Sequence, residues 1–253
     1  MLTPAPKIDA LLDTLLAEVC AILGPRLVGM YLDGSLAAGD FDPASSDIDV
    51  IVVTAGDLPD EVIGALRAMH GRIAEGSSRW ARELEVAYVA RHTIRAPGRR
   101  PGPCPCIERG SAHLEVVNLE GGYWTLHRHV LRQHGVVVMG PPPATLIDPV
   151  SPGELRQAVA DVLDDWWRPM RDDPTRLRAW GYPCYAVLTM CRILYTLHHG
   201  AIVSKPVAAR WVEATLDPRW IPLIRDARAW SAAAPPDLTA TLELIRHTHA
   251  RSR

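Results

Sequence analysis

A proline-dense segment over residues 140–149 limits how this 253-residue chain can fold. It begins Gly140-Pro141-Pro142-Pro143 and ends at Asp148-Pro149. Proline lacks a backbone N–H and fixes φ, so neither a helix nor a central strand can run through such a segment. The segment therefore predicts a boundary between two domains, which we place at residues 1–145 and 146–253.

The part before this boundary mixes helical and strand patterns. Apolar residues at helical spacing predict helices over 7–23, 59–75 and 123–134. Short apolar or alternating runs predict strands over 27–32, 47–53, 83–89 and 135–139. The prolines between 96 and 105 predict a loop. We therefore expect an α+β domain, with a mixed sheet and flanking helices.

The part after the boundary has only helical patterns. Ser151-Pro152-Gly153-Glu154 has the form of a capping box, and Trp166 continues the apolar stripe of the helix that follows. Further helices are predicted over 185–198, from Ser204 onward, and over 237–250. The second domain is thus expected to be an all-α helical bundle.

Composition excludes several classes of protein. The formal net charge is -2, with 27 basic and 29 acidic residues, which argues against a broad nucleic-acid-binding surface. No apolar run reaches the roughly 18 residues that a membrane span needs. The 5 cysteines form no disulfide framework, so we expect a cytoplasmic protein and assign Cys104 and Cys106 to a loop rather than a metal site. His127, His129 and His134 are expected to be solvated or hydrogen-bonded histidines.

One stretch has the residues of a phosphate-transfer site. Asp47 and Asp49 stand two apart in a predicted strand and so share a face, where their mutual repulsion favours a bound cation. A small set of hard oxygen ligands suits Mg²⁺. Gly34-Ser35 follows a predicted strand and can bring backbone amides and a hydroxyl to phosphate oxygens. Glu85 lies in a later strand and would face the same site if the two strands are neighbours, as a base for an attacking hydroxyl.

These residues resemble a known signature. Gly34-Ser35, Ser45-Ser46 and Asp47-Ile48-Asp49 are similar to the motif of DNA polymerase β-type nucleotidyltransferases. Within that superfamily the chain resembles bacterial aminoglycoside adenylyltransferases of the streptomycin/spectinomycin kind. The segment from 188 to 195 and the segment from 200 to 211 resemble the C-terminal helices of that family. The resemblance covers most of the chain and is weakest between about residues 92 and 122.

The resemblance implies an ATP-dependent enzyme that transfers AMP to a hydroxyl of a small, aminoglycoside- or aminocyclitol-like acceptor and releases pyrophosphate. It implies Mg²⁺ ligands at Asp47 and Asp49, and a catalytic base at Glu85. It also implies nucleotide contacts from a further group of residues: Ser35, Ser46, Arg192, Lys205 and, more loosely, Trp230. It further implies a role in antibiotic resistance. We expect a monomer that binds neither nucleic acid nor membranes.

The acceptor is the open point. The family presents acidic residues just before the helix of Arg192, whereas residues 180–185 here read Trp-Gly-Tyr-Pro-Cys-Tyr. Asp164, Asp165, Asp172 and Asp173 are candidate substitutes, and ring faces can also bind a cation. Two alternatives remain: transfer of AMP to a protein hydroxyl, as in antitoxins of the minimal nucleotidyltransferase kind, and a non-catalytic nucleotide-binding protein. The sequence also leaves ATP and other nucleoside triphosphates open.

Overall fold

The computed structural model describes residues 3, 5–43, 46–76, 78–95, 103–111, 113–118, 121–178, 181–229 and 236–252. The chain forms two compact units, each with its own hydrophobic core. The sheet unit contains Met1–Glu120 and His127–Pro149. The helical unit contains Gly121–Leu126 and Val150–Arg253.

The sheet unit is built on a mixed sheet, as predicted. Within the described residues the sheet has six strands in the order β5-β4-β3-β2-β1-β6. Strands β2 and β3 run parallel, and every other neighbouring pair is antiparallel. The strands are β1 (Leu27–Leu32), β2 (Ile48–Thr54), β3 (Leu84–Ala90), β4 (Pro103–Ile107), β5 (Glu115–Asn118) and β6 (Val136–Met139). The two central parallel strands are the ones that contain the predicted acidic residues.

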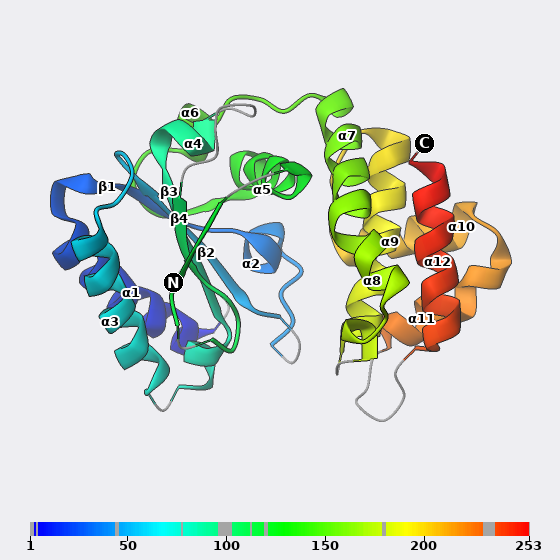
Figure 1. Cartoon of the computed structure of the whole chain (residues 1–253), viewed down its shortest axis with the longest axis horizontal. Helices are drawn as coiled ribbons and strands as arrows, with labels where there is room; N and C mark the ends of the chain where they lie inside the picture. The colour runs from blue at the N-terminus through cyan, green and yellow to red at the C-terminus, as the bar shows by residue number, and fades with distance from the viewer. Residues whose placement is uncertain are drawn as a thin grey trace. The chain divides into compact units, whose positions relative to one another are not determined.

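Two long helices, α1 (Pro6–Leu23) and α3 (Asp60–Ala74), pack beside each other against this sheet (Figure 1). Their buried residues recur at helical spacing, such as Leu12 and Leu15 on α1 and Leu66 on α3. These side chains join Met30 of β1 and Val52 of β2 in one core. The shorter helices of the unit are α2 (Gly34–Ala38), α4 (Arg91–Arg95), α6 (Pro143–Leu146) and most of α5 (Gly121–His134). The packing fixes the two central strands and hence the positions of the residues on them.

The prediction of a loop over residues 96–105 is wrong for the last three residues of that range. Residues 96–102 lie outside the described part, but Pro103–Ile107 form strand β4. Pro103 and Pro105 are alternate residues of this strand, so their missing N–H groups fall on the same side of it. Strand β4 pairs with β5 from Pro103 to Cys106 and with β3 only at Cys106 and Ile107. Proline at every second position is therefore compatible with this strand.

The helical unit surrounds one central helix, α9 (Tyr182–His199), and confirms the predicted all-α bundle (Figure 1). Its buried face includes Val187, Met190 and Leu194, which pack in one core with Leu163 and Leu244. The helices around it are α7 (Pro152–Val162), α8 (Arg168–Asp172), α10 (Lys205–Thr215), α11 (Ile221–Arg228) and α12 (Leu238–Arg251). Helix α9 ends at His199 and is followed by Gly200, whose φ of 64° is the left-handed conformation that glycine adopts readily.

The predicted helix starts differ in how they are capped. At α7, Ser151 Oγ accepts a hydrogen bond from the Glu154 N–H, and Glu154 accepts one from the Ser151 N–H, so the predicted capping box is confirmed. At α10, Ser204 occupies the N-cap position but its side chain makes no capping hydrogen bond. The sequence thus located both starts but only one of the two side-chain caps.

The prediction that the apolar stripe continues at Trp166 is wrong by one residue, because Trp167 takes the buried position. Residues Leu163–Trp167 form a π-helical turn, whose wider spacing shifts every later side chain around the helix. As a result Trp167 is 1% exposed and lies in the core, whereas Trp166 is 47% exposed. A stripe counted at α-helical spacing cannot detect such a turn.

Candidate active site

Three carboxylates meet on the two central strands of the sheet unit. Asp49 and Glu85 are directly opposite each other in the parallel pairing of β2 with β3. Asp47 lies just before β2, two residues from Asp49, and so falls on the same side. One oxygen from each of the three carboxylates lies within 4.8 Å of the others. Among the described residues this is the one group of acidic, histidine or cysteine side chains close enough to share a metal ion.

The turn that contains Gly34 and Ser35 lies against this cluster. The Asp33 N–H donates to the Asp49 carbonyl oxygen at 2.9 Å, which joins the end of β1 to β2. Gly34 has a φ of 61°, and a Cβ atom there would lie 1.9 Å from Asp49 Oδ2. Ser35 lies in the first turn of α2, and its Oγ is buried without a hydrogen-bond partner among the described residues. A backbone that passes this close to the carboxylates brings its own polar groups to the same place.

Ser46 lies at the start of the acidic segment. Its Oγ accepts a hydrogen bond from the Asp42 N–H at 3.0 Å, and its own N–H donates to the Asp42 carbonyl oxygen at 2.8 Å. The hydroxyl hydrogen of a serine remains available when its oxygen accepts. Ser46 can therefore donate to an anion while it remains fixed within its loop.

Burial and mutual repulsion make the cluster unfavourable for negative charge. Desolvation, followed by the charges of Asp47 and Glu85, raises the pKa of Asp49 to about 8. Desolvation and the charge of Asp47 also raise the pKa of Glu85, although the Arg109 N–H donates to Glu85 Oε1 at 3.3 Å. Carboxylates crowded in this way hold either protons or a cation. Their hard oxygens suit Mg²⁺, so the residues present fit such an ion.

The structure adds two residues that sequence reasoning missed, Asp33 and His127. Asp33 is 1% exposed, and its Oδ2 lies 2.8 Å from Nδ1 of His127, on α5. The predicted histidine group thus contains one hydrogen-bonded member, as expected. Asp33 had a weak sequence signal, an acid next to Gly34-Ser35. His127 had none, because the pair is separated by 94 residues.

The two predicted cations belong to the helical unit. Lys205 is the first residue of α10, and its Nζ lies 4.5 Å from the ring centroid of Tyr185. Arg192 lies on α9 and is half-buried. The structure describes both within their own unit. Trp230, the aromatic expected near the nucleotide, lies outside the described residues.

Aromatic rings gather at the N-terminal end of α9. Tyr185 stacks on Trp167 with a centroid distance of 5.9 Å, and Tyr182 meets Tyr185 edge-on at 5.6 Å. Trp180, the first residue of the predicted acid-free segment, is not described. The rings on the described part of this segment offer faces that can bind a cation or an apolar group.

Three of the four acidic candidates have partners of their own. Asp164 pairs with Arg168 and also lies 2.7 Å from His249 Nε2. Asp172 pairs with Arg171 at 2.8 Å, and Asp173 accepts hydrogen bonds from Thr175. The remaining candidate, Asp165, is exposed on the π-helical turn. Ion pairs and hydrogen bonds within the helical unit account for the positions of the three paired aspartates.

Cys104 and Cys106 lie on strand β4 and not in the loop expected for them. Cys104 is buried in β4, where its thiol donates to the Tyr88 carbonyl oxygen at 3.4 Å. Burial raises the pKa of both thiols, that of Cys106 to about 11.

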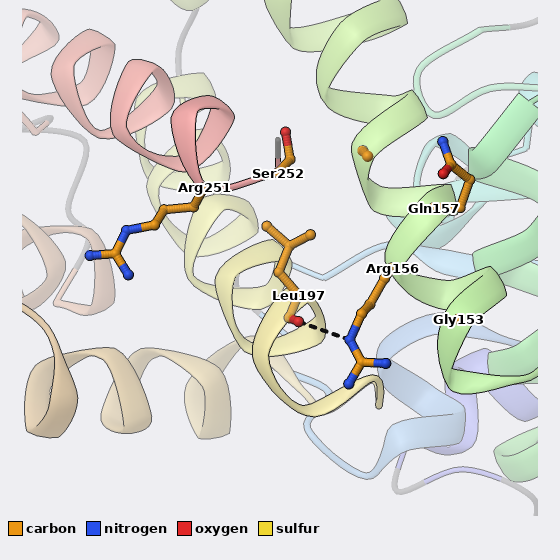
Figure 2. A pocket seen from close by; sticks show the side chains of 7 residues that line it. Gly153, Arg156, Gln157, Leu197, Arg251 and Ser252 are labelled. Atoms are coloured by element: carbon orange, nitrogen blue, oxygen red, sulfur yellow. Dashed lines mark hydrogen bonds between the residues drawn. The ribbon is translucent and has the colours of Figure 1, made fainter.

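A surface pocket lies in the helical unit, at α7 and the C-terminal ends of α9 and α12 (Figure 2). Arg156 crosses it and donates from Nε to the Leu197 carbonyl oxygen at 3.0 Å. None of the predicted site residues lines this pocket. None of the described helices combines the length and the apolar character that crossing a membrane requires.

Two protein families match the chain. The aminoglycoside adenylyltransferase C-terminal domain matches residues 145–248, and the nucleotidyltransferase domain matches residues 12–94. The second match contains all three clustered carboxylates and the Gly34-Ser35 turn. The first contains Arg192 and Lys205.

Individual relatives match over most of their length. An aminoglycoside (3'') (9) adenylyltransferase of Klebsiella pneumoniae is 29% identical over 233 residues, which cover 87% of this chain and 85% of the relative. A spectinomycin 9-adenylyltransferase of Staphylococcus aureus is 27% identical over 217 residues, which cover 82% of this chain and 78% of the relative.

A solved structure shares the fold. It is the spectinomycin adenyltransferase of Enterococcus faecialis, crystallised with ATP and spectinomycin. It matches with a TM-score of 0.70 at 16% identity, over 95% of this chain and 97% of the other.

Proposed function

Because this chain belongs to the aminoglycoside adenylyltransferase family, we propose that it transfers AMP from ATP to a hydroxyl group of a small acceptor and releases pyrophosphate. The observation that supports this most directly is the cluster of Asp47, Asp49 and Glu85 beside the Gly34-Ser35 turn. Nucleotidyl transfer needs a place for a divalent cation, a base and donors for phosphate oxygens within a few ångströms of one another. This cluster and turn offer all three.

In this proposal Asp47 and Asp49 hold Mg²⁺, which when bound offsets negative charge on the phosphates. Glu85 takes the proton from the acceptor hydroxyl as it attacks the α-phosphorus. The burial that raises the pKa of Glu85 makes it a stronger base than an exposed glutamate. The Gly34 backbone amide and the Ser35 hydroxyl donate to phosphate oxygens, and the Ser46 hydroxyl donates there with its remaining hydrogen.

The helical unit supplies cations for the same nucleotide. Lys205, at the first turn of α10, contacts the triphosphate in this proposal, and Arg192 of α9 contacts the nucleotide. The chain has only two lysines, Lys7 and Lys205, and Lys205 is half-buried. The ring of Tyr185 beside Lys205 Nζ limits the directions in which the amine can move.

The proposed acceptor is an aminoglycoside or aminocyclitol, which is supported by the names of the relatives described above. Such acceptors are cationic. Since Asp164 is already paired, the rings of Tyr182 and Tyr185 are the groups we propose to receive the acceptor. We further propose that the enzyme acts in the cytoplasm as a monomer and that it confers resistance to its acceptor.

The test is pyrophosphate release from ATP and Mg²⁺ with a panel of aminoglycosides and spectinomycin, with GTP as the alternative donor. Asp47→Ala serves as the blank, because it removes one clustered carboxylate. We expect carboxylate-dependent release with at least one member of the panel. The same member should inhibit growth of expressing cells less than growth of cells with the blank.

Two other outcomes have defined meanings. Tight Mg²⁺-dependent ATP binding without release would reject the small acceptor and favour a protein hydroxyl or a non-catalytic nucleotide-binding role. No ATP binding at all would contradict the proposed function. Where the wild type does release pyrophosphate, Glu85→Gln should bind ATP almost as the wild type does and lose turnover. A wild-type rate in Glu85→Gln would reject Glu85 as the base.

A further inference from the structure

Asp33 has a buried carboxylate whose position the local structure does not explain. It is the N-cap residue of α2, where an aspartate usually accepts a hydrogen bond from the first turn of the helix. Here the side chain makes no such bond. Instead it is 1% exposed, and its Oδ2 lies 2.8 Å from His127 Nδ1, on a helix 94 residues further along the chain.

This pair anchors the turn that lies against the carboxylate cluster. The backbone of Asp33 is bonded to Asp49, and the next residue, Gly34, lies against the Asp49 carboxylate. Two oxygen atoms of the turn, Asp33 Oδ1 and Ser35 Oγ, are buried without a hydrogen-bond partner among the described residues. Buried polar atoms without partners are rare in folded proteins, and they point to a ligand or ordered water.

The imidazole of the pair acts electrostatically on the same cluster. Burial raises the pKa of both Asp49 and Glu85, and the charge of Asp33 adds to the rise at Asp49. The charge of His127 opposes the rise at both carboxylates. His127 is therefore close enough to both carboxylates to influence them. Asp33 and His127 are part of the surroundings of the site as well as of the sheet unit's interior.

We propose that Asp33 and His127 are positioning residues for nucleotide binding. The hydrogen bond between them fixes residues 33–35, so that Gly34 and Ser35 meet the phosphates at a set distance from Asp49. This inference rests on the proposed function, because it assigns the turn to nucleotide phosphates. It adds a pair that joins this turn to α5.

The experiment measures ATP binding by calorimetry with Mg²⁺ present, and pyrophosphate release in parallel. His127→Ala removes the hydrogen bond to Asp33. His127→Asn keeps a donor, because the Asn side-chain N–H occupies nearly the place of Nδ1–H. His134→Ala is the matched control, since His134 is an exposed histidine at the C-terminal end of the same helix.

We expect His127→Ala to raise the Kd and the KM for ATP about tenfold, which equals about 1.4 kcal/mol. Its kcat should stay within about threefold of the wild-type value, because no group that touches the reacting atoms is lost. His127→Asn should restore the Kd to within about threefold, and His134→Ala should leave it unchanged. A merely structural role would lower the unfolding temperature without this selective rise in KM.

His127→Ala leaves the Asp33 carboxylate buried without its partner, which threatens folding. The double variant Asp33→Asn, His127→Ala removes that charge and keeps the test valid. Since the two residues act as a pair, it should bind ATP no more weakly than His127→Ala alone. If the wild type binds ATP and both His127→Ala and the double variant bind it equally well, the inference is overturned. A wild type that binds no ATP overturns the proposed function, and this inference with it.

Discussion

Gly34 shows how a single residue can determine the geometry of the site. Its φ of 61° is one that side chains disfavour, and a Cβ atom would meet Asp49 Oδ2 at 1.9 Å. Substitution therefore has two separable costs, backbone strain and displacement of a carboxylate. Gly39, five residues later, has a similar φ of 74° but open space where its Cβ would lie.

We expect Gly34→Ala to lower kcat/KM for ATP at least tenfold, because Asp49 must move to make room for the methyl group. Gly39→Ala is the matched control, since it has the backbone strain, about 1 kcal/mol, without the collision. Steady-state pyrophosphate release and urea unfolding of both variants test this. Equal losses of activity in the two variants would mean that strain, rather than contact with Asp49, is responsible.

The charges of the cluster predict how Mg²⁺ and pH act on stability. The folded-state pKa of Asp49, about 8, is above the ordinary aspartate value, and that of Glu85 is also raised. Between about pH 4 and 8, the metal-free folded protein holds protons that the unfolded chain releases. Stability without metal should therefore fall as pH rises through this window.

Mg²⁺ competes with those protons, so it should raise the unfolding temperature more at pH 8 than at pH 6. Thermal unfolding with and without Mg²⁺ at both values measures this. In Asp49→Asn the rise in unfolding temperature on adding Mg²⁺ should largely disappear. The stability of the metal-free variant should also fall less as pH rises. An equal Mg²⁺ effect at the two pH values would contradict the prediction.

The sequence predicts the three clustered carboxylates for physical reasons. Asp47 and Asp49 share a face because side chains two apart in a strand point the same way. Glu85 joins them because neighbouring parallel strands place Asp49 and Glu85 in register. Pairing of Asp33 with His127 has no comparable local rule, since only tertiary packing brings α5 to that turn.

At the scale of elements, the two serine N-caps of the helical unit differ in a measurable way. Ser151 and Ser204 both precede a proline-containing first turn, but only Ser151 forms a side-chain cap. Ser151→Ala should lower the free energy of unfolding by about 1 kcal/mol, because it leaves an N–H of the first turn without its acceptor. Ser204→Ala should change it by less than about 0.5 kcal/mol. Urea unfolding compares the two, and equal losses would reject the capping argument.

Most helices and strands are predicted from the sequence because their periodicity is strong. The helix expected over 7–23 is observed as Pro6–Leu23, and the strand expected over 27–32 as Leu27–Leu32. The failures occur where a rule about regular geometry does not apply. Prolines at alternate positions leave β4 intact, and the π-helical turn replaces Trp166 by Trp167 in the core.

At the scale of the molecule, the two units have separate hydrophobic cores. Leu66 lies in the core of the sheet unit and Leu163 in that of the helical unit, and both are fully buried. The contacts assign the start of α5, Gly121–Leu126, to the helical unit although the rest of that helix belongs to the sheet unit. The sequence pattern gives no sign that the start of α5 belongs to the helical unit. The domain boundary between residues 145 and 146 stays a prediction.

Separate cores predict separate responses to a cavity. Leu163→Ala should destabilise the helical unit by about 2–5 kcal/mol and leave the unfolding of the sheet unit in place, while Leu66→Ala should do the reverse. Trp80 lies within the residue limits of the sheet unit, and Trp124 lies on α5, most of which belongs to that unit. In a background with both Trp80→Phe and Trp124→Phe, tryptophan fluorescence therefore reports on the helical unit alone. In urea, that signal should shift its midpoint with Leu163→Ala and not with Leu66→Ala. Equal shifts would show that the two units unfold as one cooperative structure, because a cavity in either core would then lower the same free energy.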